Sequence, residues 1–121
     1  MIEIVIDNLI AKVNGSNVIL DQSAITLNGR TVVPVRFIAE SFGASVGWNE
    51  RTQTVMILHD DTIIEIVIDN PIAKVNGQNV LLDQSATLLN GRTVVPARFI
   101  AESFGAAVDW NEQTRTVTIM K

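Results

Sequence analysis

The sequence has no cysteine, no tyrosine and a single histidine among its 121 residues. Without cysteine there can be no disulfide bonds and no thiolate metal site. Nine basic residues face thirteen acidic ones, giving a net charge of −4, and the basic residues form no cluster. A surface that neutralises nucleic-acid phosphates is therefore not expected. No apolar run approaches the roughly 20 residues of a membrane-spanning helix, so no membrane span is expected either.

The dominant feature that the sequence does contain is an internal repeat. About three-quarters of the positions are identical when the chain is aligned with itself at an offset of 62 residues. The aligned pairs include Ile2 with Ile64, Pro34 with Pro96, and Trp48 with Trp110. We divide the chain into repeat 1 (residues 1–59) and repeat 2 (residues 60–121), with a linker turn at 60–62. Units of about 60 residues lie near the lower limit for independent folding, so we expect the repeats to pack on each other or on neighbours.

Each repeat carries the same series of strand and turn signals. Apolar residues alternate with polar ones over residues 2–7, as in a half-buried strand. Asn14-Gly15 lies between two short strand-like runs and predicts a tight hairpin, because both residues tolerate a positive φ. A helix is expected to begin at Pro34 and to end at Gly43, which suits a left-handed cap. Two further strands follow in each repeat.

These signals predict an α+β fold of two tandem repeats, each an antiparallel sheet of about five strands packed around one short helix. The strand that closes repeat 1 is expected to turn at Asp60-Asp61 directly into the strand that opens repeat 2. We expect two separate cores, one in each repeat. Their predicted members are Phe37, Ile38, Phe42, Trp48 and Val55, and Phe99, Ile100, Phe104, Trp110 and Val117.

Several motifs occur in the same order in both repeats: Asn-Gly-Arg-Thr, Val-Pro-x-Arg-Phe, Ala-Glu-x-x-Gly-Ala, Val-x-Trp and a Thr-x-Thr-Val strand. Together they resemble the copper amine oxidase N-terminal-like domain, also called the stalk domain, over nearly the whole chain. The resemblance implies an antiparallel sheet wrapped round a helix, and no catalysis. Such modules recur in secreted and surface-layer-associated proteins of Gram-positive bacteria, which implies an extracellular or cell-surface location. Because an alternating apolar and polar run follows Met1 at once, a signal peptide is not expected in these residues.

The family name raises the question of copper. A copper amine oxidase site needs several imidazoles and a tyrosine that becomes the quinone cofactor, whereas this chain has only His59 and no tyrosine. We therefore expect no metal site, no cofactor and no amine oxidation. One histidine cannot form a Ser–His pair in both repeats, so no catalytic residue is assigned. Asp21 and Asp83 are interpreted as turn residues and not as general acids or bases.

Two residue types that occur at the same positions in both repeats leave alternatives open. Arg36 and Arg98 could bind a carboxylate ligand or a sugar acid, because a planar guanidinium can donate two parallel hydrogen bonds. The interpretation we favour is that Arg36 braces its helix against Glu40, one turn away. Trp48 and Trp110 could stack on a sugar ring, but each shares a strand face with apolar residues, so burial in the core is favoured.

Three functions are consistent with this sequence. The first is a non-catalytic structural or assembly module of a bacterial surface protein, whose partners are further copies or other surface-protein domains. The second is a small carbohydrate- or peptide-binding module, for example for cell-wall polysaccharide, in which duplication provides avidity. The third, an uncharacterised enzyme, is the least favoured. Binding predicts exposed aromatic residues and a concave pocket, so the burial of Trp48 and Trp110 distinguishes the second function from the first.

The assembly hypothesis assigns a role to the strands at the ends of the chain. These strands lack the covalent link that joins the two strands meeting at residues 60–62. We hypothesise that the C-terminal strand of one molecule meets the N-terminal strand of the next, which gives a head-to-tail filament if the rotation between copies does not close a ring. The alternative is that each terminal strand pairs within its own repeat. The residues assigned to the subunit contact are Ile2, Ile4, Ile6, Val117, Ile119 and Met120.

Overall fold

The computed structural model describes residues 1–121 and contains fourteen short strands and two short helices. Repeat 1 forms β1 (Ile2–Val5), β2 (Ile10–Val13), β3 (Ser16–Ile19), β4 (Ile25–Leu27), β5 (Arg30–Pro34), α1 (Val35–Ser41), β6 (Ser45–Asn49) and β7 (Thr54–His59). Repeat 2 forms β8 (Thr62–Val67), β9 (Ile72–Val75), β10 (Gln78–Leu81), β11 (Thr87–Leu89), β12 (Arg92–Pro96), α2 (Ala97–Ser103), β13 (Ala107–Asn111) and β14 (Thr116–Met120). Strands make up 52% of the chain and helices 12%, so the fold is mainly β and the predicted α+β class is wrong.

Local turn chemistry accounts for the boundaries of these elements. Asn14 and Gly15 have φ values of 51° and 85°, the left-handed pair that a tight hairpin between β2 and β3 requires. Gly43 has φ of 83° directly after the C-cap of α1, which confirms the predicted left-handed end of the helix. Pro34 is the N-cap of α1, one residue before the first helical position, with extended backbone that also belongs to β5.

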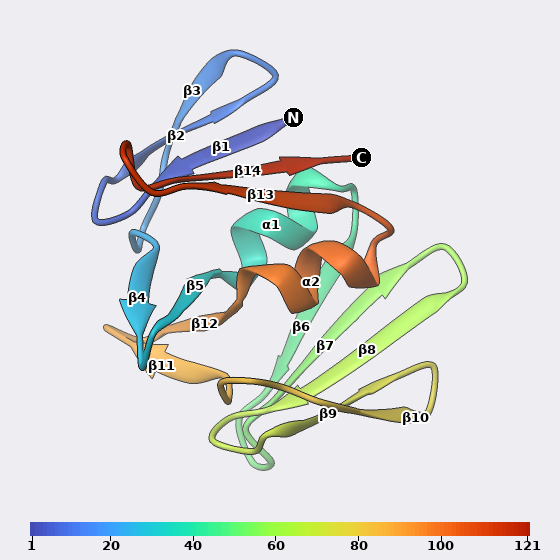
Figure 1. Ribbon diagram of the computed structural model, residues 1–121. Coiled ribbons are helices and arrows are strands. Elements are labelled where there is room, and N and C mark those ends of the chain that lie inside the picture. Colours follow the sequence, from blue (N-terminus) through green and yellow to red (C-terminus); the bar gives the residue numbers. More distant parts are fainter.

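The strands form three antiparallel sheets, and every sheet contains strands from both repeats (Figure 1). One five-stranded sheet has the order β13-β14-β1-β2-β3, and the other has the order β10-β9-β8-β7-β6. A four-stranded sheet, β11-β12-β5-β4, joins the repeats through the β12–β5 pair. The expectation of one sheet per repeat is therefore wrong. Alternation of apolar residues determines which face of a strand is buried, but it does not determine which strand lies beside it.

Two strand pairs connect the repeats in the same register. β7 pairs with β8 across the Asp60-Asp61 turn, as predicted, with Ile57 opposite Ile64. β1 pairs with β14 within the same chain, with Ile2 opposite Ile119, and no covalent link joins these two strands. The two chain ends consequently lie side by side (Figure 1). We call β7–β8 the linked seam and β1–β14 the open seam.

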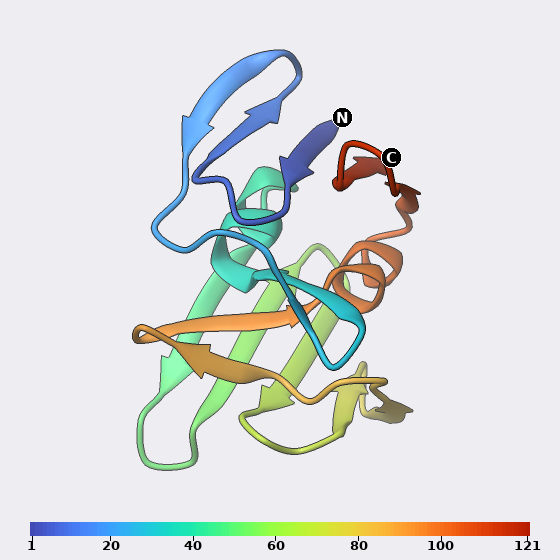
Figure 2. The same cartoon turned by 60° about the vertical axis from the view of Figure 1, so that its left-hand side comes forward.

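One continuous core of 27 buried residues replaces the two predicted cores. The helices lie between the two five-stranded sheets, and the four-stranded sheet crosses beside them (Figures 1 and 2). Ile38 and Ile100 are completely buried, whereas Phe37 and Phe99 are only partly buried. The rings of Phe42 and Phe104 stack with their centroids 5.2 Å apart, so the repeats meet at an aromatic contact. The core forms as one because each five-stranded sheet draws its apolar face from both repeats.

Candidate ligand-binding grooves

The two tryptophans are exposed, which corrects the prediction that they are buried in the core. Trp48 is 39% exposed and Trp110 is 42% exposed. Trp48 lies opposite Val55, which is buried, so the predicted strand face is right. Its exposure arises because β6 is the edge strand of its sheet and Trp48 is the last residue but one of that strand. The indole therefore lies at the margin of the sheet, where it lines a groove instead of the core.

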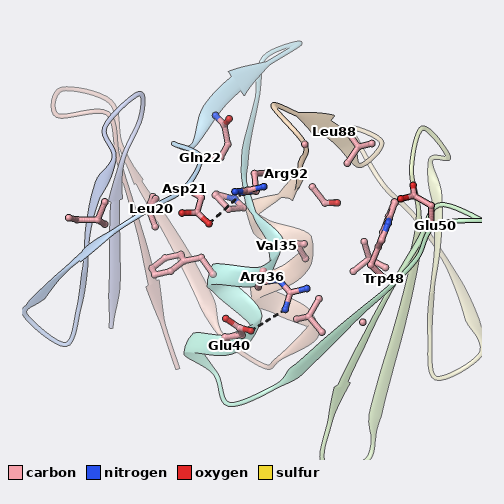
Figure 3. A pocket seen from close by; sticks show the side chains of 18 residues that line it. Leu20, Asp21, Gln22, Val35, Arg36, Glu40, Trp48, Glu50, Leu88 and Arg92 are labelled. Carbon is pink, nitrogen blue, oxygen red and sulfur yellow. Dashed lines mark hydrogen bonds and ion pairs between the residues drawn. The ribbon is translucent and has the colours of Figure 1, made fainter.

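Groove 1 has a volume of about 630 Å³ and is open to solvent on one side (Figure 3). Trp48 on β6 forms one wall, and Leu20 with the residues that follow β3 forms the opposite wall. Helix α1 contributes Val35 and Arg36 between them. Leu88 on β11 and Arg92 on β12 complete the groove from repeat 2. The groove therefore exists only because strands of both repeats meet there.

Two ion pairs cross or border groove 1 (Figure 3). Arg36 Nη1 lies 3.3 Å from Glu40 Oε2, which confirms the predicted brace along the helix. Arg92 Nε lies 3.5 Å from Asp21 Oδ2 and connects the two repeats. All four side chains are more than half exposed, so each pair contributes little to stability and its polar atoms remain accessible to a ligand. The groove thus offers an aromatic face together with both cationic donors and carboxylate acceptors.

Groove 2, of about 510 Å³, is the counterpart of groove 1 with the roles of the repeats exchanged. It is lined by Trp110 and Arg98 of repeat 2 and by Arg30 of repeat 1. Arg30 Nε lies 3.6 Å from Asp83 Oδ2, and Arg98 pairs with Glu102 at 3.3 Å. Both grooves therefore present the same kinds of group: an indole, a helix-borne arginine and an ion pair between the repeats.

The two grooves differ at a few substituted positions. Gly47 lines groove 1, and the aligned residue in β13 is Asp109. Leu88 in groove 1 is replaced by Thr26 in groove 2. Trp110 Nε1 donates a hydrogen bond of 3.4 Å to Glu112, whereas Trp48 makes no such bond. Groove 1 is the larger of the two, and the indole N–H of its tryptophan makes no hydrogen bond within the chain.

The structure places the predicted ligand-contact residues, Arg36 and Arg98, one in each groove. It places the predicted subunit-contact residues in the open seam, where all except Met120 are buried. Sequence reasoning missed Arg92 and Leu88 as neighbours of Trp48, because they belong to the other repeat. It also treated Asp21 as a turn residue, although its carboxylate pairs with Arg92. Only knowledge of the β12–β5 pairing could have brought these residues together.

The residues of this chain do not fit a copper site. His59 packs edge-on against Phe104, with ring centroids 5.4 Å apart, and its Nδ1 lies 3.8 Å from Asp60 Oδ2. No group of three or more histidine and carboxylate side chains is arranged to hold a metal ion. We therefore derive no metal chemistry from the family name. No helix in the structure is long and apolar enough to cross a membrane.

Comparison with known proteins identifies the family of this chain. The chain belongs to the family of copper amine oxidase N-terminal domains, whose model matches residues 2–119. This family region is non-catalytic. The chain is also similar to a protein named protease inhibitor from Brevibacillus choshinensis, with 31% identity over 117 residues. That alignment covers 93% of this chain and 34% of the relative, so the chain spans about a third of that protein.

Proposed function

We propose that this chain is a non-catalytic carbohydrate-binding module that attaches to a cell-surface or extracellular polysaccharide through its two grooves. The observation that carries the proposal is the exposed indole of Trp48 on one wall of groove 1, which Arg36 and the Asp21–Arg92 pair also line. A large aromatic side chain left exposed in a concave site, instead of in the adjacent core, is the feature that distinguishes binding from a purely structural role.

The chemistry of groove 1 matches the two faces of a sugar ring. The apolar C–H face of a pyranose can lie against the flat indole, as expected for a stacked aromatic contact. Its hydroxyl groups need both donors and acceptors, which Arg36, Arg92, Asp21 and Glu50 supply. A volume of about 630 Å³ lies within the usual range for sites that enclose a small ligand or a short segment of a polymer.

Duplication of the groove supports a polymeric ligand. Two related grooves on one rigid core can bind two segments of one chain, and the second segment then binds at a high effective concentration. Each site can be weak while the whole module binds tightly. A surface location is part of the proposal because family members of this kind are often extracellular.

The direct test is isothermal titration of the full chain with purified cell-wall polysaccharide and with defined neutral and acidic oligosaccharides. We expect Trp48→Ala to lower affinity for the preferred oligosaccharide at least tenfold, and Trp110→Ala to lower the stoichiometry for a polymer. Met56→Ala is the matched control, because Met56 is 40% exposed but lies outside both grooves. Equal affinities of Trp48→Ala and the parent chain for every glycan would refute the proposal.

A second candidate is binding to a protein partner, which the name of the Brevibacillus choshinensis relative favours. In that case an extended peptide segment would occupy groove 1 beside β6, whose outer backbone edge is unpaired. Inhibition assays against a panel of proteases test this candidate. Inhibition that Trp48→Ala abolishes, without any glycan binding, would replace the carbohydrate proposal by this one.

A further inference from the structure

The open seam repeats the geometry of the linked seam without its covalent connection. Ile4 lies opposite Val117 in the open seam, as Ile66 lies opposite Val55 in the linked seam. The amide of Ile6 donates to the carbonyl of Arg115 at 2.9 Å, matching the bond from Ile68 to Gln53 at 3.0 Å. In the linked seam, the turn at residues 60–62 fixes which two strands meet. In the open seam, only non-covalent contacts do so.

Those non-covalent contacts at the open seam are specific. Arg115 Nη1 lies 3.8 Å from Asp7 Oδ2, whereas the corresponding position in the linked seam is the uncharged Gln53. Lys121 Nζ lies 5.7 Å from the centre of the Phe42 ring, in a cation–π contact. Register and the Asp7–Arg115 ion pair therefore match β14 to β1, whichever molecule supplies β1. The Lys121 contact holds the end of β14 against the end of α1.

The unit that carries β1 is connected to the rest of the chain by a short irregular segment. Strands β1, β2 and β3 lie together in one sheet and are followed by residues 21–24, which belong to no helix or strand. The Ala24 carbonyl accepts from the Asp7 amide at 2.8 Å, and Gln22 Oε1 accepts from Asn90 at 2.9 Å, so an exchange must form these bonds again between copies. Exchange of an identical element between copies is a low-cost route to assembly, because the exchanged contacts are the same as those in the closed molecule.

We propose that the open seam is an exchange interface, at which the β1–β3 unit (residues 1–20) of a second copy of this chain pairs with β14. Reciprocal exchange gives a closed dimer, and non-reciprocal exchange gives the head-to-tail assembly expected from the sequence. The partner copy then also contributes to a groove, because Ile19 and Leu20 at the end of this unit line groove 1. The exchanged unit therefore contributes residues both to the interface between copies and to groove 1. The exchange itself requires no ligand.

Paired cysteines can show which molecule supplies each strand, because the natural chain contains no cysteine. Glu3 and Thr118 face each other across the open seam, and Glu65 and Met56 face each other across the linked seam. The bond from Ile6 to Arg115 makes Ile6–Arg115 a hydrogen-bonded pair, so Glu3–Thr118 is a non-hydrogen-bonded pair with closely spaced side chains. The double variants Glu3→Cys/Thr118→Cys and Met56→Cys/Glu65→Cys therefore form matched probes of equal geometry.

Each full-length double variant is refolded at about 10 μM and at about 1 mM, and the higher value is near the effective concentration of a short tether. The protein is then oxidised, and the products are separated by electrophoresis without reductant. We expect interchain disulfides in the open-seam variant to rise at least tenfold with concentration, whereas the linked-seam variant forms intrachain disulfides throughout. Exclusively intrachain disulfides in the open-seam variant at both concentrations would overturn the proposal. Equal interchain cross-linking of the two variants would also overturn it, because that result indicates non-specific association.

Discussion

A shared core predicts that damage to repeat 1 lowers the stability of repeat 2 to the same extent. Ile38 on α1 is completely buried in the single core, and Ile38→Ala removes three carbon atoms from it. Such truncations cost about 2–5 kcal/mol, and we expect about 3 kcal/mol here because the surrounding strands cannot close the cavity fully. With a urea m-value of about 2 kcal/mol/M, the unfolding midpoint should fall by about 1.5 M.

Single-tryptophan variants allow each repeat to be followed separately. Trp110→Phe leaves Trp48 as the fluorescent probe of repeat 1, and Trp48→Phe leaves Trp110 as the probe of repeat 2. Both probes should report the same midpoint shift on Ile38→Ala, because one core unfolds as one cooperative unit. Ile100→Ala, in the equivalent position of α2, is the matched control and should shift both midpoints similarly. A midpoint from Trp110 that is unchanged by Ile38→Ala would refute the shared core.

Three further predictions follow from single positions, each checked by urea unfolding or titration. Gly43→Ala should lower the free energy of unfolding by about 1–2 kcal/mol, because φ is +83°. No atom crowds an added Cβ there, so backbone strain is the whole cause. Gly47→Ala in β6 should change stability by less than half as much, and equal costs would refute this account of Gly43. Arg36→Ala should lower stability by less than about 0.5 kcal/mol, because its ion pair with Glu40 is exposed, and a larger loss would indicate a buried role. Leu88→Thr should weaken glycan binding in groove 1, by giving it the residue that groove 2 has at Thr26; unchanged affinity would exclude this position from the site.

The sequence was sufficient to predict the hairpin turns and the helix of each repeat, but not the short strands β4 and β11. Asn14-Gly15 and Gly43 determine their turns through backbone preferences that depend on the residues themselves. The pairing of the strands could not be predicted in this way. Because the repeats are so similar, a strand such as β1 satisfies the same register with β14 or with an equivalent strand elsewhere, and its pattern of alternation is identical in each case.

The candidate site was only partly predictable for the same reason. Arg36 was identified from its motif, and its pairing with Glu40 followed from helical spacing. The exposure of Trp48 could not be predicted, because alternation indicates an inward face but not whether anything covers the end of an edge strand. Arg92 and Leu88 reach groove 1 through the pairing of β12 with β5, a contact between segments far apart in the sequence.

The central claim is that groove 1 binds a carbohydrate chain through Trp48, and a fluorescence titration of Trp110→Phe tests it most directly. This variant retains Trp48 as its one indole, so any spectral change reports on groove 1. We predict a saturable blue shift and intensity change with the preferred oligosaccharide, because the ligand removes the half-exposed ring from water. Binding that is measurable by calorimetry but leaves the Trp48 emission unchanged would contradict the claim.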